Sequence, residues 1–208
     1  MNHRKIFITV AASMLSILAF SQESQSWKRF ENNLQLGGGL FLETGNDHRI
    51  KAGKQNPGTV LRLSYGLDIR FNEKWSVMPG AGFRTQAGGL RNRREYGAYN
   101  DCMSLTDLFL TARYHLDSGK SRIVFGLGPA ISYIVSPAYY DYDHDLEKFR
   151  RLDVGIQPSV TFLHGEHFQW GVEANIGLSD IRLRYLELNM PFDSTYQHYL
   201  ALTCGWHF

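Results

Sequence analysis

The sequence lacks any hydrophobic run, beyond one near its N-terminus, that is long enough to cross a membrane as a helix. Among 208 residues, the one extended uncharged apolar stretch covers residues 6–20. A transmembrane helix needs about 20 apolar residues. The rest of the chain therefore crosses a membrane as a closed β-barrel, or it does not cross one.

The chain also lacks a large net charge of either sign. The formal net charge is +2 and there is no tract of lysine or arginine, so nucleic acid is excluded as a partner. The phosphate-binding, serine-nucleophile and paired-histidine metal motifs are absent as well.

Cysteine is scarce, since the chain holds only Cys102 and Cys204. If the chain folds into a barrel, we expect Cys102 in an outer loop and Cys204 near the opposite rim. A disulfide requires Cα atoms within about 7 Å of each other. Both cysteines are therefore predicted to be free thiols.

The N-terminus has the layout of a secretory signal peptide. His3, Arg4 and Lys5 precede the apolar stretch, and Ala19 and Ser21 place small residues before a cleavage point. This pattern predicts a signal peptide over residues 1–21, with an uncleaved anchor helix as the alternative. A polar periplasmic lead over 22–33 and a barrel domain over 34–208 are expected to follow.

Alternating hydrophobicity fills most of the remaining chain. In the clearest segment, Leu61, Leu63 and Tyr65 fall on one face of a strand, whereas Arg62 and Ser64 fall on the other. Eight such segments are expected, at 34–43, 61–71, 75–84, 107–116, 123–133, 153–162, 168–179 and 199–208. Segments of about ten alternating residues are typical of membrane barrels.

The connections between these segments alternate in length. Residues 72–74, 117–120 and 165–167 are short turns, whereas 44–57, 88–104, 135–149 and 180–195 are long. Short periplasmic turns and long outer loops are the rule in outer-membrane barrels. The sequence therefore predicts an all-β, eight-stranded, antiparallel up-and-down transmembrane β-barrel of a bacterial outer membrane, with both termini in the periplasm.

Aromatic residues and prolines give further information about the strands. One group of aromatic residues falls near the short turns or the C-terminus: Phe71, Trp75, Tyr114, Phe162, Phe168, Trp170, Trp206 and Phe208. Phe83 and Tyr133 fall near the long loops. Two belts are expected at the two bilayer interfaces. Pro79, Pro129 and Pro158 lie within strands, where proline removes a ladder hydrogen bond. We interpret them as candidate bulges on the outward face.

The polar faces of the strands are rich in glycine, serine and threonine and carry single charges of both signs. This pattern favours a narrow lumen in which charges pair, because an unpaired buried charge is costly. A soluble barrel with its apolar face inside is the structural alternative. The charges predicted to form a lumen network are Glu43, Arg62, Asp68, Arg70, Arg84, Asp107, Arg113, Asp153 and Glu173.

Several segments resemble one known family. Leu105 to Leu116, Gly126 to Tyr133, Asp153 to Ile156 and Trp170 to Leu178 are similar, in order and spacing, to strands of the PorT-like outer-membrane β-barrel proteins of the Bacteroidetes. The resemblance covers about residues 34–208 and implies fold and location rather than one activity. The final Trp206 and Phe208 resemble the terminal signal that the barrel-assembly machinery reads.

Histidines and loop residues are the remaining candidates for chemistry. His115, His198 and His207 are predicted to face the lumen, where histidine beside aspartate can support catalysis or simply hold the barrel together. An acidic loop at 139–147 has alternating aspartates but not the Gly and Glu that an EF-hand needs. Arg91, Arg93 and Arg94, with Lys51 and Lys54, can bind lipopolysaccharide phosphates or be ordinary solvated charges.

Together these observations favour a non-enzymatic barrel with a structural or interaction role through its extracellular loops. The alternatives are a barrel enzyme acting on lipid or peptide, and a small-solute channel. An open channel is disfavoured, because eight strands leave an interior just wide enough for side chains. No cofactor or metal is expected. The expected partners are outer-membrane lipid and lipopolysaccharide, the barrel-assembly machinery and a protein at the outer loops.

Overall fold

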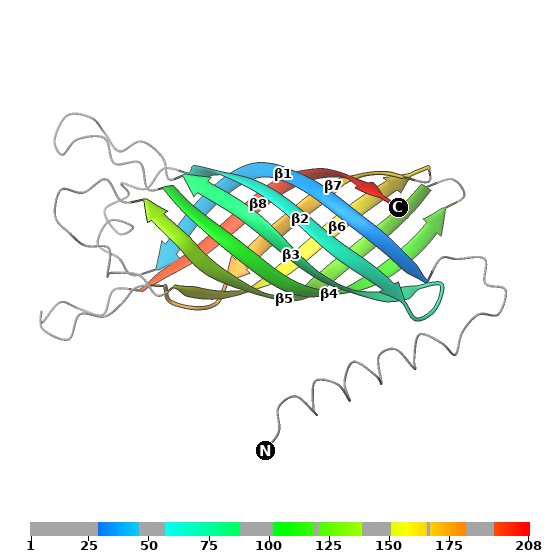
Figure 1. Cartoon of the computed structure of the whole chain (residues 1–208), viewed down its shortest axis with the longest axis horizontal. Coiled ribbons are helices and arrows are strands. Elements are labelled where there is room, and N and C mark those ends of the chain that lie inside the picture. Colours follow the sequence, from blue (N-terminus) through cyan, green and yellow to red (C-terminus); the bar gives the residue numbers. More distant parts are fainter. Residues whose placement is uncertain are drawn as a thin grey trace, which may run out of the picture.

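Eight strands form one closed antiparallel barrel in the computed structural model, which confirms the predicted fold class (Figure 1). Each strand pairs with its neighbours in sequence, and β1 also pairs with β8. The structure describes residues 29–45, 57–87, 102–118, 121–138, 151–165, 167–181 and 194–208. The strands are β1 (Phe30–Gly45), β2 (Gly58–Arg70), β3 (Trp75–Ala87), β4 (Cys102–Ser118), β5 (Ser121–Ala138), β6 (Leu152–His164), β7 (Phe168–Gly177) and β8 (Thr195–His207).

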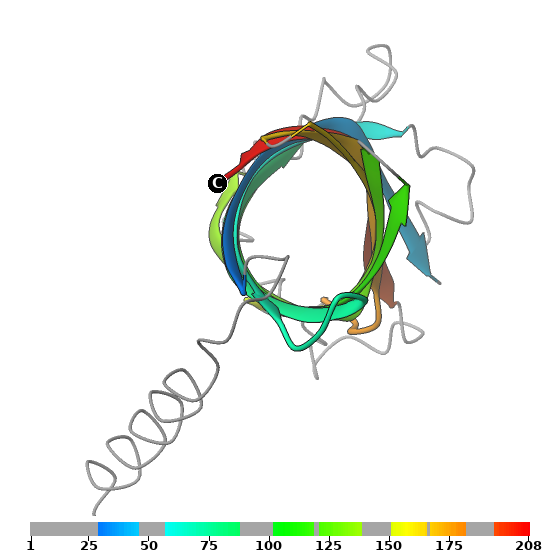
Figure 2. The same ribbon diagram turned by 90° about the vertical axis from the view of Figure 1, so that its right-hand side faces the viewer.

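Side chains alternate between the inside and the outside of the barrel, whose single ring of strands is seen end-on in Figure 2. In β2, Arg62 and Ser64 are buried, whereas Leu61 and Leu63 are exposed. The polar face of each strand therefore turns inward and the apolar face outward. A soluble barrel would have the opposite arrangement, because it buries its apolar face.

The outward apolar surface forms a belt around the barrel. In β5 the exposed apolar side chains run from Phe125 to Val135 at every second residue, broken only by Pro129. Stacked aromatic pairs lie near the short turns, such as Phe162 and Trp170 with ring centroids 4.5 Å apart. Among the described residues, no helix is long and apolar enough to cross a membrane.

The two ends of the barrel differ in their connections. Residues 71–74, 119–120 and 165–167 join strands at one end, which we call the short-turn end. The longer connections 46–57, 88–101, 139–151 and 178–194 leave from the other end, here the long-connection end. The first residues of β1 and the last of β8 meet at the short-turn end, where the Asn32 and Phe208 backbones exchange hydrogen bonds of 2.7 and 3.0 Å.

The first strand begins earlier than the sequence predicts. Its first residue is Phe30 rather than Leu34, so part of the predicted 22–33 lead belongs to the barrel. Glu31 and Asn33 point inward and are buried, which explains why this stretch looks like a polar lead. The predicted signal peptide 1–21 lies outside the described residues.

The interpretation of the three prolines as bulges is wrong. The pairing of β2 with β3 is interrupted beside Pro79, that of β4 with β5 beside Pro129 and that of β6 with β7 beside Pro158. Each pairing resumes in the same register, because a proline removes one donor without adding a residue. The register shift lies elsewhere, between Ser104 and Leu105.

The lumen as candidate functional site

The structure places eight of the nine charges predicted for the lumen at buried positions, each at most 8% exposed. They are Arg62, Asp68, Arg70, Arg84, Asp107, Arg113, Asp153 and Glu173. Glu43 is the exception, because it is only half-buried, near the long-connection end of β1. The strand alternation thus turns charged side chains from β2, β3, β4, β6 and β7 into one narrow interior.

The first of two clusters lies toward the long-connection end. Arg62 pairs with Glu173 from β7, and Arg84 lies 3.2 Å from Asp107. Asp107 is also 3.6 Å from Arg62, so one carboxylate is shared by two guanidinium groups. The Tyr199 hydroxyl donates a 2.6 Å hydrogen bond to Glu173. Such mutual pairing compensates much of the cost of burying these charges.

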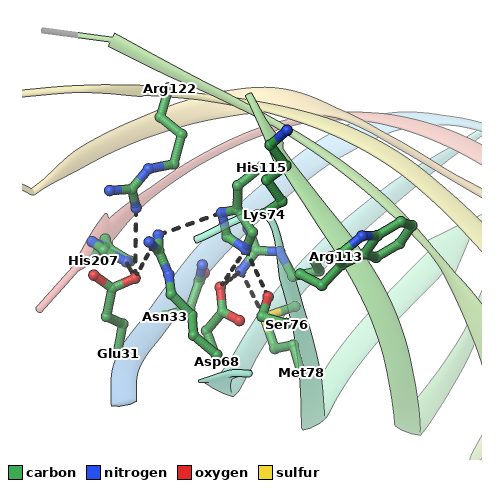
Figure 3. A network of polar contacts seen from close by, with 12 residues as sticks. Glu31, Asn33, Asp68, Lys74, Ser76, Met78, Arg113, His115, Arg122 and His207 are labelled. Carbon is green, nitrogen blue, oxygen red and sulfur yellow. Dashed lines mark hydrogen bonds and ion pairs between the residues drawn. The ribbon is translucent and has the colours of Figure 1, made fainter. Parts of the chain in front are cut away.

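The second cluster lies at the short-turn end (Figure 3). Arg113 Nη1 is 2.6 Å from Asp68 Oδ2. Glu31 Oε2 lies 3.2 Å from Arg70, 2.9 Å from His207 and 3.7 Å from Arg122. One carboxylate from β1 therefore contacts basic groups of β2, β5 and β8.

Many of these contacts join strands that are not neighbours in the sheet. Arg62 of β2 reaches Glu173 of β7, and Asn33 of β1 exchanges hydrogen bonds with Gln169 of β7. Arg84 of β3 donates to Ser132 of β5 at 3.0 Å. Side chains from separate parts of the wall therefore meet inside the barrel, and the lumen is crossed by polar contacts at several levels.

His115 has a serine and an aspartate nearby but lacks the geometry of a catalytic triad. Its Nε2 atom is 2.7 Å from Ser76 Oγ and also faces Asp68 Oδ2 at 3.8 Å. Its Nδ1 atom lies 3.4 Å from the Arg70 guanidinium. In a triad the carboxylate orients the ring through the nitrogen opposite the serine. Here an arginine occupies that side.

The prediction that His198 faces the lumen is wrong. It lies in the same outward row as Leu200 and Leu202, and its ring contacts Thr44 Oγ1 at 2.7 Å. Hydrophobicity alternates less completely in the last segment, so the sequence did not reveal which of its residues face the lumen. His207, by contrast, is buried as predicted.

Sequence reasoning missed several residues of the lumen. Glu31 lies within the predicted polar lead 22–33, and Arg122 falls between the predicted turn 117–120 and the predicted strand 123–133. Tyr199, Gln86 and Gln197 are uncharged residues that nonetheless lie inside the barrel. Extending the inward parity of each strand to its observed ends would have found Glu31, Gln86, Arg122 and Gln197, because the alternation continues beyond the predicted segments. Tyr199 already lies within the predicted segment 199–208, whose inward face was not identified.

Other candidates fall partly or wholly outside the described residues. These include the acidic loop 139–147 and the basic residues Lys51, Lys54, Arg91, Arg93 and Arg94. No group of three or more potential metal ligands occurs within the described ranges. Cys204 is free and exposed, so it forms no disulfide with Cys102.

Comparisons with known proteins agree with this architecture. A family model described as "Outer membrane protein beta-barrel domain" matches residues 20–182. No curated protein sequence matches the chain.

Among solved structures, the chain is similar to the outer membrane protein OprG from Pseudomonas aeruginosa, with a TM-score of 0.54 and 13% identity over 86% of this chain and 95% of that one. It also resembles Neisserial surface protein A, with a TM-score of 0.47 and 10% identity over 86% and 96%. The attachment invasion locus protein Ail of Yersinia pestis gives 0.45 and 10% over 87% and 100%. At such identities the likeness to OprG shows the fold alone.

Proposed function

The chain belongs to the outer membrane protein beta-barrel domain family, and on that premise we propose that it is a non-enzymatic barrel acting through its extracellular loops. Its strands carry it through the outer membrane. The role itself, in stabilising the envelope or contacting a partner, resides in the long connections.

The main support for this proposal is the state of the lumen. Its polar side chains bind one another across the barrel, as Arg62 with Glu173 and Arg84 with Ser132. An enzyme needs a convergent polar group left accessible to substrate, and a channel needs a continuous wet path. The His115 geometry argues against the first alternative, and the contacts across the barrel argue against the second.

The orientation follows from the lengths of the connections. Outer-membrane barrels keep short turns in the periplasm and long loops outside. We therefore assign the short-turn end, with both termini, to the periplasm and the long-connection end to the cell exterior. The signal peptide over residues 1–21 accounts for export in this scheme.

The proposed partners are of two kinds. The exposed Trp206 and Phe208 at the short-turn end are the candidate signal for the barrel-assembly machinery. Arg91, Arg93 and Arg94 are the candidate contacts for lipopolysaccharide phosphates, since guanidinium groups bind phosphate in a bidentate manner. Membership of the narrower PorT-like group is part of the proposal and is supported by the order of its motifs.

The experiment compares loop variants of the folded barrel in vesicles. Arg91, Arg93 and Arg94 are replaced together by glutamine, and binding of lipopolysaccharide is measured. We expect the triple variant to fold normally and to bind lipopolysaccharide more weakly. The dependence of this binding on salt concentration should also be lost. A matched control replaces Asp141, Asp143 and Asp145 by asparagine and should not weaken binding.

Conductance across planar bilayers tests the channel alternative in the same preparation. We expect no current above the leak of the lipid alone. Lipopolysaccharide binding that is unaffected by the arginine substitutions would refute the loop assignment. A steady single-channel current would refute the non-channel role.

A further inference from the structure

The inward face of the barrel changes character toward the long-connection end. Here the lumen is lined by apolar side chains in addition to the polar ones. We call this layer the apolar cap; its members are Phe41, Val60, Met103, Leu105, Ile134, Tyr199 and Ala201, each at most 5% exposed. They come from β1, β2, β4, β5 and β8, so most of the wall contributes to the layer.

The cap consists of two packed groups. Met103 and Leu105 of β4 pack with Ile134 of β5. Phe41 and Val60, from β1 and β2, pack with Tyr199 and Ala201 of β8. The two groups stand on opposite sides of the ring, because β4 and β8 are separated by three strands in either direction.

A polar contact across the lumen joins these two sides. Gln86 of β3 donates a 2.8 Å hydrogen bond to Gln197 of β8. The Gln197 amide also points at the Met103 sulfur at 3.3 Å. Both glutamines are at most 1% exposed, so this bridge lies within the cap and not at a wet surface.

Among the described residues, no packed apolar cluster of this kind lies at the opposite end of the lumen, where Leu163 and Val124 are buried apolar side chains outside any such cluster. There the polar cluster continues to the rim through Arg122, which lies 2.7 Å from the exposed Asp117. The charged part of the lumen therefore ends at the partly exposed Asp117–Arg122 ion pair at the short-turn end. At the long-connection end it ends beneath the apolar cap. A hydrated ion entering through apolar side chains must shed its water, which is costly.

We propose that the apolar cap is a permeability seal that closes the lumen toward the long-connection end. It keeps water and hydrated ions from the Arg62–Asp107–Arg84 cluster beneath it. The seal does not depend on what the outer loops bind, and a failure of the loop assignment would leave it standing.

Thiol accessibility tests the seal in the folded, full-length barrel. Cys102→Ser and Cys204→Ser remove the native thiols, and Ser132→Cys places a reporter beside Arg84. Ser132 points inward, is buried, and lies two residues deeper than Ile134 along β5. The probe is a small, charged methanethiosulfonate, and the readout is its rate of reaction in detergent micelles, where it reaches both ends.

We expect the reporter to react far more slowly than an exposed rim reporter, Ser121→Cys. Adding Leu105→Ser should raise the rate at position 132 about tenfold or more, because a smaller polar side chain admits water to the layer. Ile134→Ser should act in the same way and serves if the first variant does not fold. Leu105→Met preserves the apolar volume of the side chain, so the reporter in this variant should react as slowly as in the parent.

Leu108→Ser is the matched control, since Leu108 lies on the same strand but faces outward. It should leave the rate unchanged, while heat-dependent gel mobility verifies folding in every variant. The seal is refuted if the parent reporter reacts as fast as the rim reporter. Equal rates in the folded Leu105→Ser, Ile134→Ser and Leu108→Ser variants would refute it as well.

Discussion

The Asp68–Arg113 pair allows the lumen network to be tested by its energetics. The two groups lie 2.6 Å apart, with side chains 1% and 3% exposed. Replacing Arg113 by methionine leaves a buried carboxylate whose nearest remaining basic group is His115, at 3.8 Å. Removing one partner of a buried pair costs about 3–5 kcal/mol, and we expect a loss of that size in the free energy of unfolding.

The double variant, Asp68→Leu with Arg113→Met, should be much less damaging. Two apolar side chains of similar volume remove the charge and its desolvation together, so its stability should lie within about 2 kcal/mol of the parent. The sum of the stability losses in the two single variants would then far exceed the loss in the double variant. Such non-additivity is the signature of direct coupling between the two residues.

The Asp117–Arg122 pair serves as a control with similar chemistry and different burial. Its atoms are 2.7 Å apart, but the side chains are 55% and 25% exposed. Asp117→Ala should therefore cost at most about 1 kcal/mol. Urea unfolding in lipid vesicles, followed by tryptophan fluorescence, measures all four variants. Single losses below about 1 kcal/mol at Arg113, or strict additivity in the cycle, would refute the reasoning.

Three further predictions concern the wall of the barrel and its assembly. Gly39→Ala should destabilise the barrel by about 1–3 kcal/mol, because the new Cβ would lie 1.9 Å from the Leu200 carbonyl oxygen. Gly38→Ala is the control, since its Cβ would meet only ordinary van der Waals contacts. Equal urea midpoints for the two variants would contradict this prediction. Leu202→Arg places a charge on the lipid face and should cost about 2–4 kcal/mol, whereas His164→Arg at the rim should cost about 0–1; similar losses in vesicles would count against the proposed belt. Phe208→Ala keeps the backbone bonds to β1, so we expect less assembled barrel in cells but normal refolding in detergent, and an unchanged cellular yield would rule out the C-terminal signal.

Much of the fold could be predicted because a β-barrel repeats one local rule. The alternation of Leu61, Arg62 and Leu63 is visible within a single segment, and its recurrence predicts eight strands. Errors arose where local composition competed with that rule. Glu31 looked like part of a polar tail, although pairing with Asp68 across β1 and β2 makes it a strand residue.

The contacts within the lumen could be predicted only in part. Inward charges follow from parity, but their partners do not, because Arg62 and Glu173 are far apart in sequence and on strands that are not neighbours. The apolar cap was invisible for a related reason. Met103 lies beyond the predicted end of its strand, and Ile134 just beyond another, so neither was assigned to the inside.

The central claim is that this chain is a folded barrel of the outer membrane, and heat-dependent gel mobility after membrane fractionation tests it most directly. The protein should be found in the outer-membrane fraction, and it should migrate differently before and after boiling, because the closed β-sheet resists detergent until it is heated. A chain that is recovered soluble from the periplasm, with the same mobility before and after heating, would contradict the account.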